Sequence, residues 1–247
     1  MSKVLYVLLV QMLIVSVSAS AGQMTELNKR AYTSVKVKAD KGEANSQFAL
    51  AGMYYQGIVT NKDYIKAAAM YEKAANQGHV KAMYNLAIMY HKGDGIPADQ
   101  AKSIKLFKKA IEKGDVKSNL YLASMYYVGR GVKRDYSKAF KWYKIAADAG
   151  YPLAQSKVGR MYRKGRGVEQ NNVLAAKYLK KSAVQSCGDA QFELGKMYLK
   201  GDGIAKDRKE AEFLIKEAYL NGNENAKKVL DDEDWTAEFK GVNLPEE

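Results

Sequence analysis

The sequence has few of the residues that catalytic and metal sites most often use. Its 247 residues include one cysteine, Cys187, and two histidines, His79 and His91. One thiol cannot form a disulfide within the chain, so Cys187 is interpreted as a small residue packed near a helix start, with an intermolecular disulfide as the alternative. The histidines lie twelve residues apart without a nearby cysteine. That spacing does not match common zinc motifs, and both are interpreted as surface residues.

Sequence motifs for catalysis are missing as well. There is no G-x-S-x-G nucleophile motif, and no glycine loop continues into the lysine and hydroxyl residue of a phosphate-binding loop. The acidic residues fill helix-cap or exposed positions, and no pair of them recurs as an acid–base couple. We therefore predict that the protein is not an enzyme and that it has no catalytic residues, cofactor or metal site.

The first residues form a short apolar run. Lys3 precedes a nearly continuous apolar stretch from Val4 to Val15, and the small residues Ala19 and Ala21 follow. This order is typical of a signal peptide over residues 1–21, cleaved after Ala21. An uncleaved membrane anchor is the alternative, but the run is too short to span a bilayer comfortably. No cysteine follows the run, so a lipoprotein signal is absent. We expect a periplasmic or secreted protein.

Positive charge dominates the remainder of the chain. The formal net charge is +13. Residues 231–247 hold seven acidic residues and one lysine, a net charge of −6, so residues 22–230 carry +18. This predicts partners with acidic surfaces or an anionic component of the cell envelope. Nucleic acid would fit the charge, but export argues against it.

The most informative pattern is a period of 36 residues, repeated five times. A Met-Tyr pair and, three residues after the tyrosine, a glycine recur at this spacing, which indicates stacked helical repeats. In the third unit, apolar residues at helical spacing predict a first helix over about Val116 to Val128. Gly129 breaks that helix, Asp135 caps the next, and Gly150 ends it. We interpret the Met-Tyr pairs as core packing and not as a ligand site.

Several other positions recur in register and support this reading. On the first helix, a column of small residues comprises Ser46, Ala82, Ser118, Ala154 and Ala190, and a column of aliphatic residues, mostly leucine, comprises Leu50, Leu86, Leu122, Val158 and Leu194. On the second helix, a column of small residues comprises Ala67, Ser103, Ala139, Ala175 and Ala211. The N-cap position of the second helix is occupied by Asp63, Asp99, Asp135, Asn171 and Asp207. Small residues at the same place in each unit predict close helix crossings. Two departures stand out: Gly57-Ile58-Val59 lacks a second glycine, and Ser186 replaces a terminal glycine.

These residues divide the chain into segments. We predict a signal peptide (1–21), an N-terminal capping helix (22–41), a repeat solenoid (42–230) and an acidic tail (231–247). Units start near residues 42, 78, 114, 150 and 186, with a half unit at 222–230. In the capping helix, from about Glu26 to Asp40, Ala31 and Val35 are expected to face inward. The tail contains Trp235 and Phe239. It is either disordered or docked on the basic helices, and the two aromatic residues slightly favour partial docking.

At this point the chain resembles the Sel1-like repeat family. The third unit carries Leu122, Tyr126, Gly129-Arg130-Gly131-Val132, Asp135, Lys138-Ala139, Trp142-Tyr143 and Ala146-Ala147. The resemblance covers about Gly42 to Gly222. It implies an all-α fold, a right-handed α/α superhelix similar to tetratricopeptide arrays, and adaptor or scaffold roles between proteins. Among exported bacterial members it also implies signalling regulators, host-interaction proteins and immunity proteins that neutralise antibacterial effectors. The lone Cys187 separates this chain from cysteine-rich members of the family.

Positions that vary between units are the candidates for partner binding. One stripe of the first helices, expected to line a concave face, carries lysine, arginine and tyrosine, which often anchor or steer protein interfaces. The candidate residues on and beside this stripe are Lys81, Asn85, Lys117, Tyr121, Tyr127, Lys157, Arg160, Arg163, Lys164 and Lys196. Tyr121 is expected to be exposed. A second basic cluster lies on the loop edge of units three and four and comprises Arg130, Lys133, Arg134 and Arg166. The alternative is that these lysines only keep the face solvated.

Two classes of function remain open. The first is an exported interaction scaffold that captures a protein with an acidic patch, as an immunity partner in one form, and acts as a monomer. The second is an envelope-binding protein for anionic lipid or peptidoglycan, or a host-interaction factor. Salt dependence separates a specific interface from diffuse polyanion binding.

Overall fold

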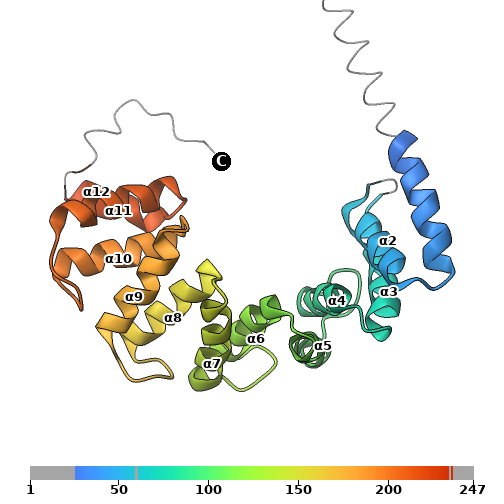
Figure 1. Cartoon of the computed structure of the whole chain (residues 1–247), viewed down its shortest axis with the longest axis horizontal. Coiled ribbons are helices and arrows are strands. Elements are labelled where there is room, and N and C mark those ends of the chain that lie inside the picture. The colour runs from blue at the N-terminus through green and yellow to red at the C-terminus, as the bar shows by residue number, and fades with distance from the viewer. Residues whose placement is uncertain (1–25, 59–60, 234, 236–247) are drawn as a thin grey trace, which may run out of the picture. The chain divides into compact units, whose positions relative to one another are not determined.

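The computed structural model describes residues 26–58, 61–233 and 235, and this part of the chain consists of helices and turns without a strand. The predicted signal peptide and residues 236–247 of the acidic tail, including Phe239, lie outside the described residues. A helix over residues 26–40 comes first. The helices that follow are α2 Ala44–Gln56, α3 Tyr64–Asn76, α4 Val80–Lys92, α5 Gln100–Glu112, α6 Val116–Val128, α7 Tyr136–Asp148, α8 Pro152–Lys164, α9 Asn172–Ala183, α10 Gly188–Lys200, α11 Arg208–Leu220 and α12 Glu224–Asp232 (Figure 1).

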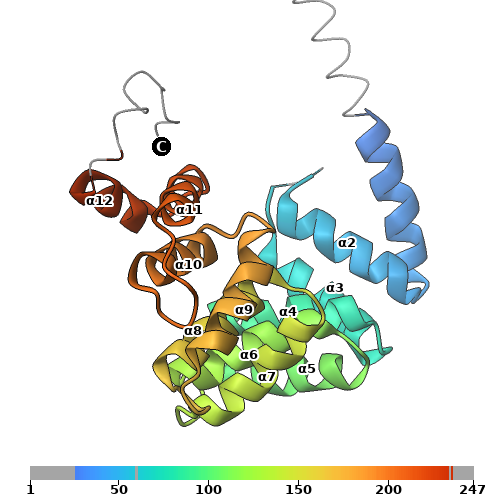
Figure 2. The same ribbon diagram turned by 60° about the vertical axis from the view of Figure 1, so that its left-hand side comes forward.

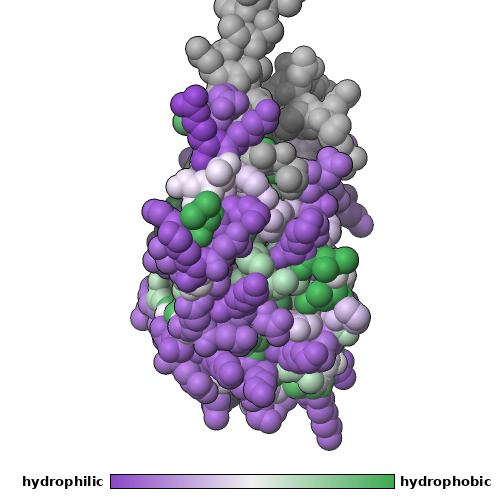
Figure 3. All heavy atoms as spheres, turned by 90° about the vertical axis from the view of Figure 1, so that its right-hand side faces the viewer, coloured by the Kyte–Doolittle hydropathy of each residue, from purple (hydrophilic) through white to green (hydrophobic). Residues whose placement is uncertain are grey.

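The described residues form two compact units, with the division between Asp115 and Val116. In the first, α2 packs on α3, α3 on α4 and α4 on α5; in the second, each helix from α6 to α12 packs on the next. Each unit has its own hydrophobic core. The face drawn in Figure 3 is mostly hydrophilic with small scattered hydrophobic patches.

The predicted helix caps are all present. Asp135 accepts a hydrogen bond from the backbone N–H of Lys138 at 2.9 Å, and Asp63, Asp99 and Asn171 cap their helices in the same way. Asp207 accepts from both Lys209 and Glu210. Each cap residue also donates its own N–H to the carbonyl of the tyrosine in the Met-Tyr pair, as Asp135 does to Tyr126 at 2.9 Å. The same loop therefore closes in every repeat, because orphan backbone groups at both helix ends find partners.

The predicted core columns are buried. Leu122, Val158 and the small residues Ala139 and Ala175 have no exposed surface. Full burial of alanine at the second-helix column allows close backbone approach between the two helices of a repeat. Four of the five methionines of the Met-Tyr pairs are buried as well, which confirms their role in the core; Met53 is half-buried.

The loop glycines do more than turn the chain. A Cβ on Gly167 would lie 2.2 Å from the backbone carbon and oxygen of Tyr136, the first residue of α7 in the preceding repeat. Gly95 and Gly203 make the same close approach to Tyr64 and Asn172. The second glycine of these three G-x-G loops is thus a contact between repeats. This explains why the first repeat can lack it, since no repeat precedes that loop.

A ladder of buried amides joins successive helices, and the sequence columns did not reveal it. Gln155 on α8 donates to the carbonyl of Ala147 on α7 at 3.2 Å and accepts from the side chain of Gln185 at 2.9 Å. Gln47 and Gln191 occupy the same position and make equivalent bonds. In the second repeat the position holds Met83, and in the third it holds Asn119, which donates to Val116 on its own helix at 3.1 Å, so the ladder is interrupted in these two repeats.

The two ends of the described chain differ from the sequence expectation in detail. Over residues 26–40, Ala31 is exposed instead of facing inward, because the buried face passes through Tyr32, Val35 and Ala39. At the other end, α12 continues to Asp232, two residues beyond the predicted end of the half unit. Trp235 is buried in the core formed with α11 and α12. The start of the acidic segment is therefore docked.

Candidate functional site

The predicted stripe of the second unit lies on the first helices of its repeats, α6, α8 and α10. On α8, Lys157 and Arg160 are half-buried and Lys164 is exposed, at positions that share one helix face. On α6, Lys117 is exposed. None of the lysines Lys117, Lys157 and Lys164 has an ion-pair partner among the described residues. Their ammonium groups are available to an anionic partner.

Glu193 on α10 joins the stripes of α8 and α10. Its carboxylate forms an ion pair with Arg163 and lies 3.7 Å from the Nε atom of Arg160. The side chains of Glu193 and Arg163 are only 13% and 18% exposed. Low exposure strengthens such a pair and also makes it costly to break. The two arginines are thus partly neutralised within the protein, whereas we had expected both to face a partner.

A tyrosine and arginine cluster borders the stripe, at the ends of α6 and α8. The guanidinium of Arg166 donates to the hydroxyl of Tyr127 and lies 5.8 Å and 5.6 Å from the ring centroids of Tyr127 and Tyr136. Arg134 lies over the Tyr136 ring at 5.5 Å. The hydrogen bond to Tyr127 raises the pKa of Arg166. These contacts hold two guanidinium groups in place on aromatic faces.

Three of the candidate side chains have aromatic or other partners within the protein. Tyr121, expected to be exposed, is half-buried and has a partner within the protein. Tyr127 packs edge-on against Tyr136 and Tyr143, with ring centroids 5.1 Å and 6.5 Å away, because the next helix covers it. Lys196 lies over its neighbour Phe192 at 5.0 Å. Of these, the tyrosines present only part of their surface to a partner.

The remaining predicted residues belong to the first unit. Lys81 on α4 is exposed, while Asn85 is half-buried and hydrogen-bonds with the Tyr71 hydroxyl. That bond holds α4 against α3, so Asn85 serves packing. The candidate binding surface is therefore the stripe on α6, α8 and α10 of the second unit.

Both histidines have structural partners instead of lying free on the surface. His79 caps α4 by accepting the N–H of Ala82 at its Nδ1 atom, at 3.1 Å, and its ring stacks on Phe48 at 4.5 Å. Burial lowers the pKa of His79. His91 bonds with Gln100, which in turn donates to the His91 carbonyl. Both side chains fasten helices, and neither is part of a ligand set in the described residues.

The described residues contain no cluster of three or more histidine, cysteine, aspartate or glutamate side chains able to hold a metal ion. No described helix has both the length and the apolar character needed to cross a membrane.

The sequence did not identify two features of this surface. Glu193 occupies the stripe position of the fifth unit, four residues after Asp189 and three before Lys196, but nothing in a single repeat indicates that it meets arginines from the neighbouring repeat. Arg166 was assigned to a separate loop cluster. The signal that could have placed it is its spacing of 39 residues from Tyr127, which matches the spacing between Tyr55 and its hydrogen-bond partner Asp94 in the first unit.

Comparisons with known proteins agree with the repeat architecture. The model of the Sel1 repeat family matches residues 44–79, 80–115, 116–151, 152–185 and 188–223. A Sel1 repeat protein from Oxalobacter formigenes is similar to the chain, with 31% identity over 83% of this chain and 81% of that one, and a TM-score of 0.73. No match was found among curated proteins.

A second solved structure is a protective antigen from uropathogenic Escherichia coli strains. It shares 29% identity over 87% of this chain, with a TM-score of 0.60. This chain spans 53% of that protein's length. A Sel1 repeat protein from Klebsiella pneumoniae shares 25% identity over 81% of this chain and 98% of its own, with a TM-score of 0.50. The predicted all-α repeat fold is thereby confirmed, and the chain belongs to the Sel1 repeat family.

Proposed function

We propose that the protein is an exported interaction scaffold whose stripe on α6, α8 and α10 captures the acidic surface of a partner protein. The observation that carries this is the set of lysines without ion-pair partners, Lys117, Lys157 and Lys164, on the first helices of neighbouring repeats. Membership of the Sel1 repeat family, whose members act as scaffolds between proteins, supports the same class of function.

The mechanism follows from the arrangement of charge. Lysines that are not paired internally attract an acidic surface and speed its association without a large contribution to the final affinity. The Tyr127, Tyr136 and Arg166 cluster would then supply a rigid aromatic and guanidinium contact at the edge of the stripe, since tyrosine and arginine dominate interface hot spots. Glu193 restrains this attraction, because its carboxylate offsets part of the positive charge of Arg160 and Arg163.

The test uses opposite changes on one surface. The partner is first isolated from envelope extract by affinity capture with residues 22–247 and identified by mass spectrometry. Lys117→Glu, Lys157→Glu and Lys164→Glu together should slow its association about tenfold or more at low salt. Glu193→Gln should instead speed association, because it frees two arginines. Unchanged rates for a folded triple variant would exclude this surface.

An immunity protein is one form of this function. In that case the captured partner is a secreted effector, and mixing the two proteins at equal concentration abolishes the effector's activity. A partner whose activity is unaffected would favour an adaptor or host-interaction role.

A second candidate function is the binding of an anionic envelope component. The observation that favours it is the wide spread of exposed lysines outside the stripe, for example Lys105, Lys108 and Lys109 on α5. Binding to anionic vesicles or peptidoglycan should then fall smoothly as salt rises, whereas a specific protein interface should persist near 150 mM salt, where screening acts over about 8 Å. The triple variant of the stripe should barely change diffuse binding.

A further inference from the structure

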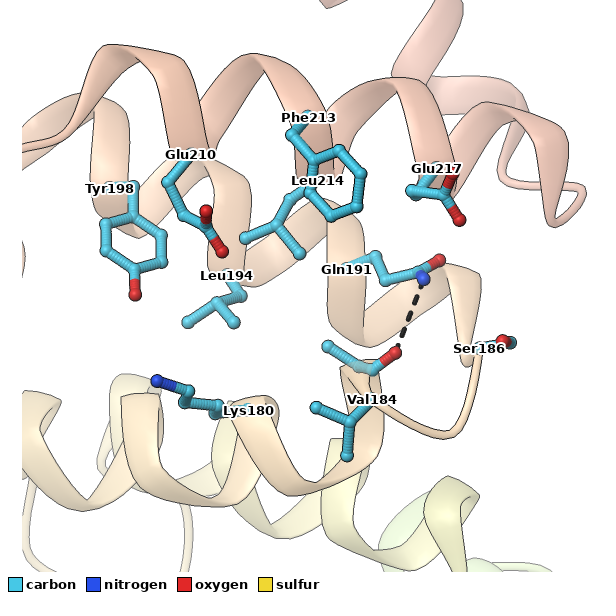
Figure 4. A pocket seen from close by; sticks show the side chains of 11 residues that line it. Lys180, Val184, Ser186, Gln191, Leu194, Tyr198, Glu210, Phe213, Leu214 and Glu217 are labelled. Atoms are coloured by element: carbon cyan, nitrogen blue, oxygen red, sulfur yellow. Dashed lines mark hydrogen bonds between the residues drawn. The ribbon is translucent and has the colours of Figure 1, made fainter.

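The second unit has a groove on the side of the repeats formed by the second helices. It lies between α9 and α11, and α10 forms its floor; the cavity volume is about 260 Å³ (Figure 4). In both ribbon views α10 lies beside α9 and α11 (Figures 1 and 2). At one end, Gln191 of the floor donates to the carbonyl of Ala183 at 3.3 Å and fixes α10 against α9.

The apolar part of the groove is open to solvent. Phe213 on α11 is 57% exposed and Val184, at the end of α9, is 75% exposed. Leu194 and Leu214, both buried, form the base between them. Exposed large apolar side chains around a preformed depression are typical of surfaces that bind another chain.

The charged rim of this groove is acidic on one wall. Glu210 and Glu217 stand on either side of Phe213 along α11, three and four residues away (Figure 4). Neither carboxylate has an ion-pair partner among the described residues. Lys180 lies on the opposite wall. Two unpaired carboxylates flanking an aromatic side chain favour a ligand that carries positive charge on both sides of an apolar group.

The equivalent groove of the first unit has the opposite charges. It lies between α3 and α5 over α4, and its volume is about 250 Å³. Each of its lining positions lies 108 residues, or three repeats, before a counterpart in the groove of the second unit. Lys102, Lys105 and Lys109 correspond to Glu210, Phe213 and Glu217, and Glu72 corresponds to Lys180. The acidic wall is thus not common to all the repeats. It is specific to this groove, although residues 22–230 as a whole carry a net charge of +18.

The groove is separate from the stripe. On α10, the floor residues Gln191, Leu194 and Tyr198 follow helical spacing on one face, whereas Glu193 and Lys196 lie on the opposite face. A ligand in the groove therefore leaves the stripe accessible.

We propose that the groove between α9 and α11 binds an amphipathic helical segment of a partner protein, with one apolar side chain packed against Phe213 and Val184 and flanking lysine or arginine side chains on Glu210 and Glu217. Helices often bind in this way, with anchors at spacings of three, four and seven residues. The positive charge of the protein as a whole repels such a segment, so specific attraction must come from the acidic wall.

The probe is a fluorescent peptide of about 15 residues with an apolar stripe at helical spacing and lysine flanks; its matched control carries glutamate in place of lysine. Fluorescence anisotropy measures the Kd. We expect Glu210→Lys with Glu217→Lys to weaken binding of the lysine peptide by about tenfold or more and to favour the glutamate peptide. Phe213→Ser should weaken both peptides at this groove.

The control variant makes the same change of charge outside the groove, with Glu169→Lys and Asp232→Lys, both exposed on the second unit. It should leave the Kd of the lysine peptide within about twofold. Equal effects of the two double variants, or an affinity that Phe213→Ser does not change, would overturn the proposal. So would sedimentation that shows a wild-type dimer lost in Phe213→Ser, because the groove would then hold a second copy of the chain.

Discussion

The G-x-G loops provide the sharpest test of how the repeats are held together. Both glycines of the fourth repeat, Gly165 and Gly167, have positive φ angles, +60° and +71°. A Cβ on Gly165 would lie 3.5 Å from the Cβ of Gln170, 3.7 Å from its nitrogen and 3.8 Å from the carbonyl oxygen of Val168, all ordinary contacts. A Cβ on Gly167 would lie 2.2 Å from the backbone of Tyr136 and 2.6 Å from the nitrogen of Ser137. The two positions therefore share their backbone strain and differ in the contact between repeats.

The expected magnitudes follow from this difference. Alanine in a left-handed conformation costs about 1–2 kcal/mol, and this applies to both Gly165→Ala and Gly167→Ala. At Gly167 the methyl carbon also overlaps backbone atoms that normally stay about 3.5 Å or more away, so α7 and the loop must separate. Overpacking of this kind costs about 1–3 kcal/mol more. We expect Gly167→Ala to lower the free energy of unfolding by about 3 kcal/mol and Gly165→Ala by about 1 kcal/mol.

Urea unfolding followed by circular dichroism measures the two free energies. Native-state hydrogen exchange then shows where protection of the backbone amides is lost. The loss should concentrate at the start of α7 and at α8, because each repeat is stabilised mainly by contacts with its direct neighbours. Equal destabilisation by the two variants would refute the conclusion that the second glycine is a contact between repeats. A uniform loss of protection across the second unit would also contradict it.

Three further variants test other contacts. Ser186 adopts a positive φ of 59° where other repeats have glycine, so Ser186→Gly should raise the free energy of unfolding by about 1 kcal/mol. An unchanged urea midpoint would show that the left-handed backbone of Ser186 is not strained. The folded-state pKa of His79 lies below its unfolded value, so stability is fully present above about pH 6.5 and falls as pH drops through the folded-state pKa. His79→Asn retains a cap and should flatten this dependence in unfolding curves recorded across pH; a wild-type slope in the variant would exclude His79 as its source. Trp235→Ala removes a buried ring and its contact with Arg208 at 5.3 Å, and should lower the free energy of unfolding at the C-terminal end by about 3 kcal/mol. The control Leu220→Ala, at a position 53% exposed, should not lower it.

Local rules of the repeat could be inferred from the sequence because they act within about 36 residues. The cap at Asp135, the bounds of α6 and the two buried columns that include Leu122 and Ala139 follow from helix periodicity and from the chemistry of helix ends. A register maintained over five units made each of these predictions independent of any single residue.

Contacts between repeats were decided only by the tertiary structure. Glu193 reaches Arg160 and Arg163 across about 30 residues of sequence, and this converts part of a basic stripe into an internal ion-pair network. The acidic wall of Glu210 and Glu217 gains meaning only beside Phe213, Val184 and a floor supplied by another helix. The physical reason is the distance along the sequence over which each effect acts. Periodicity within one repeat specifies which face of a helix is apolar, whereas the neighbours of a charged side chain depend on how successive repeats are rotated and packed.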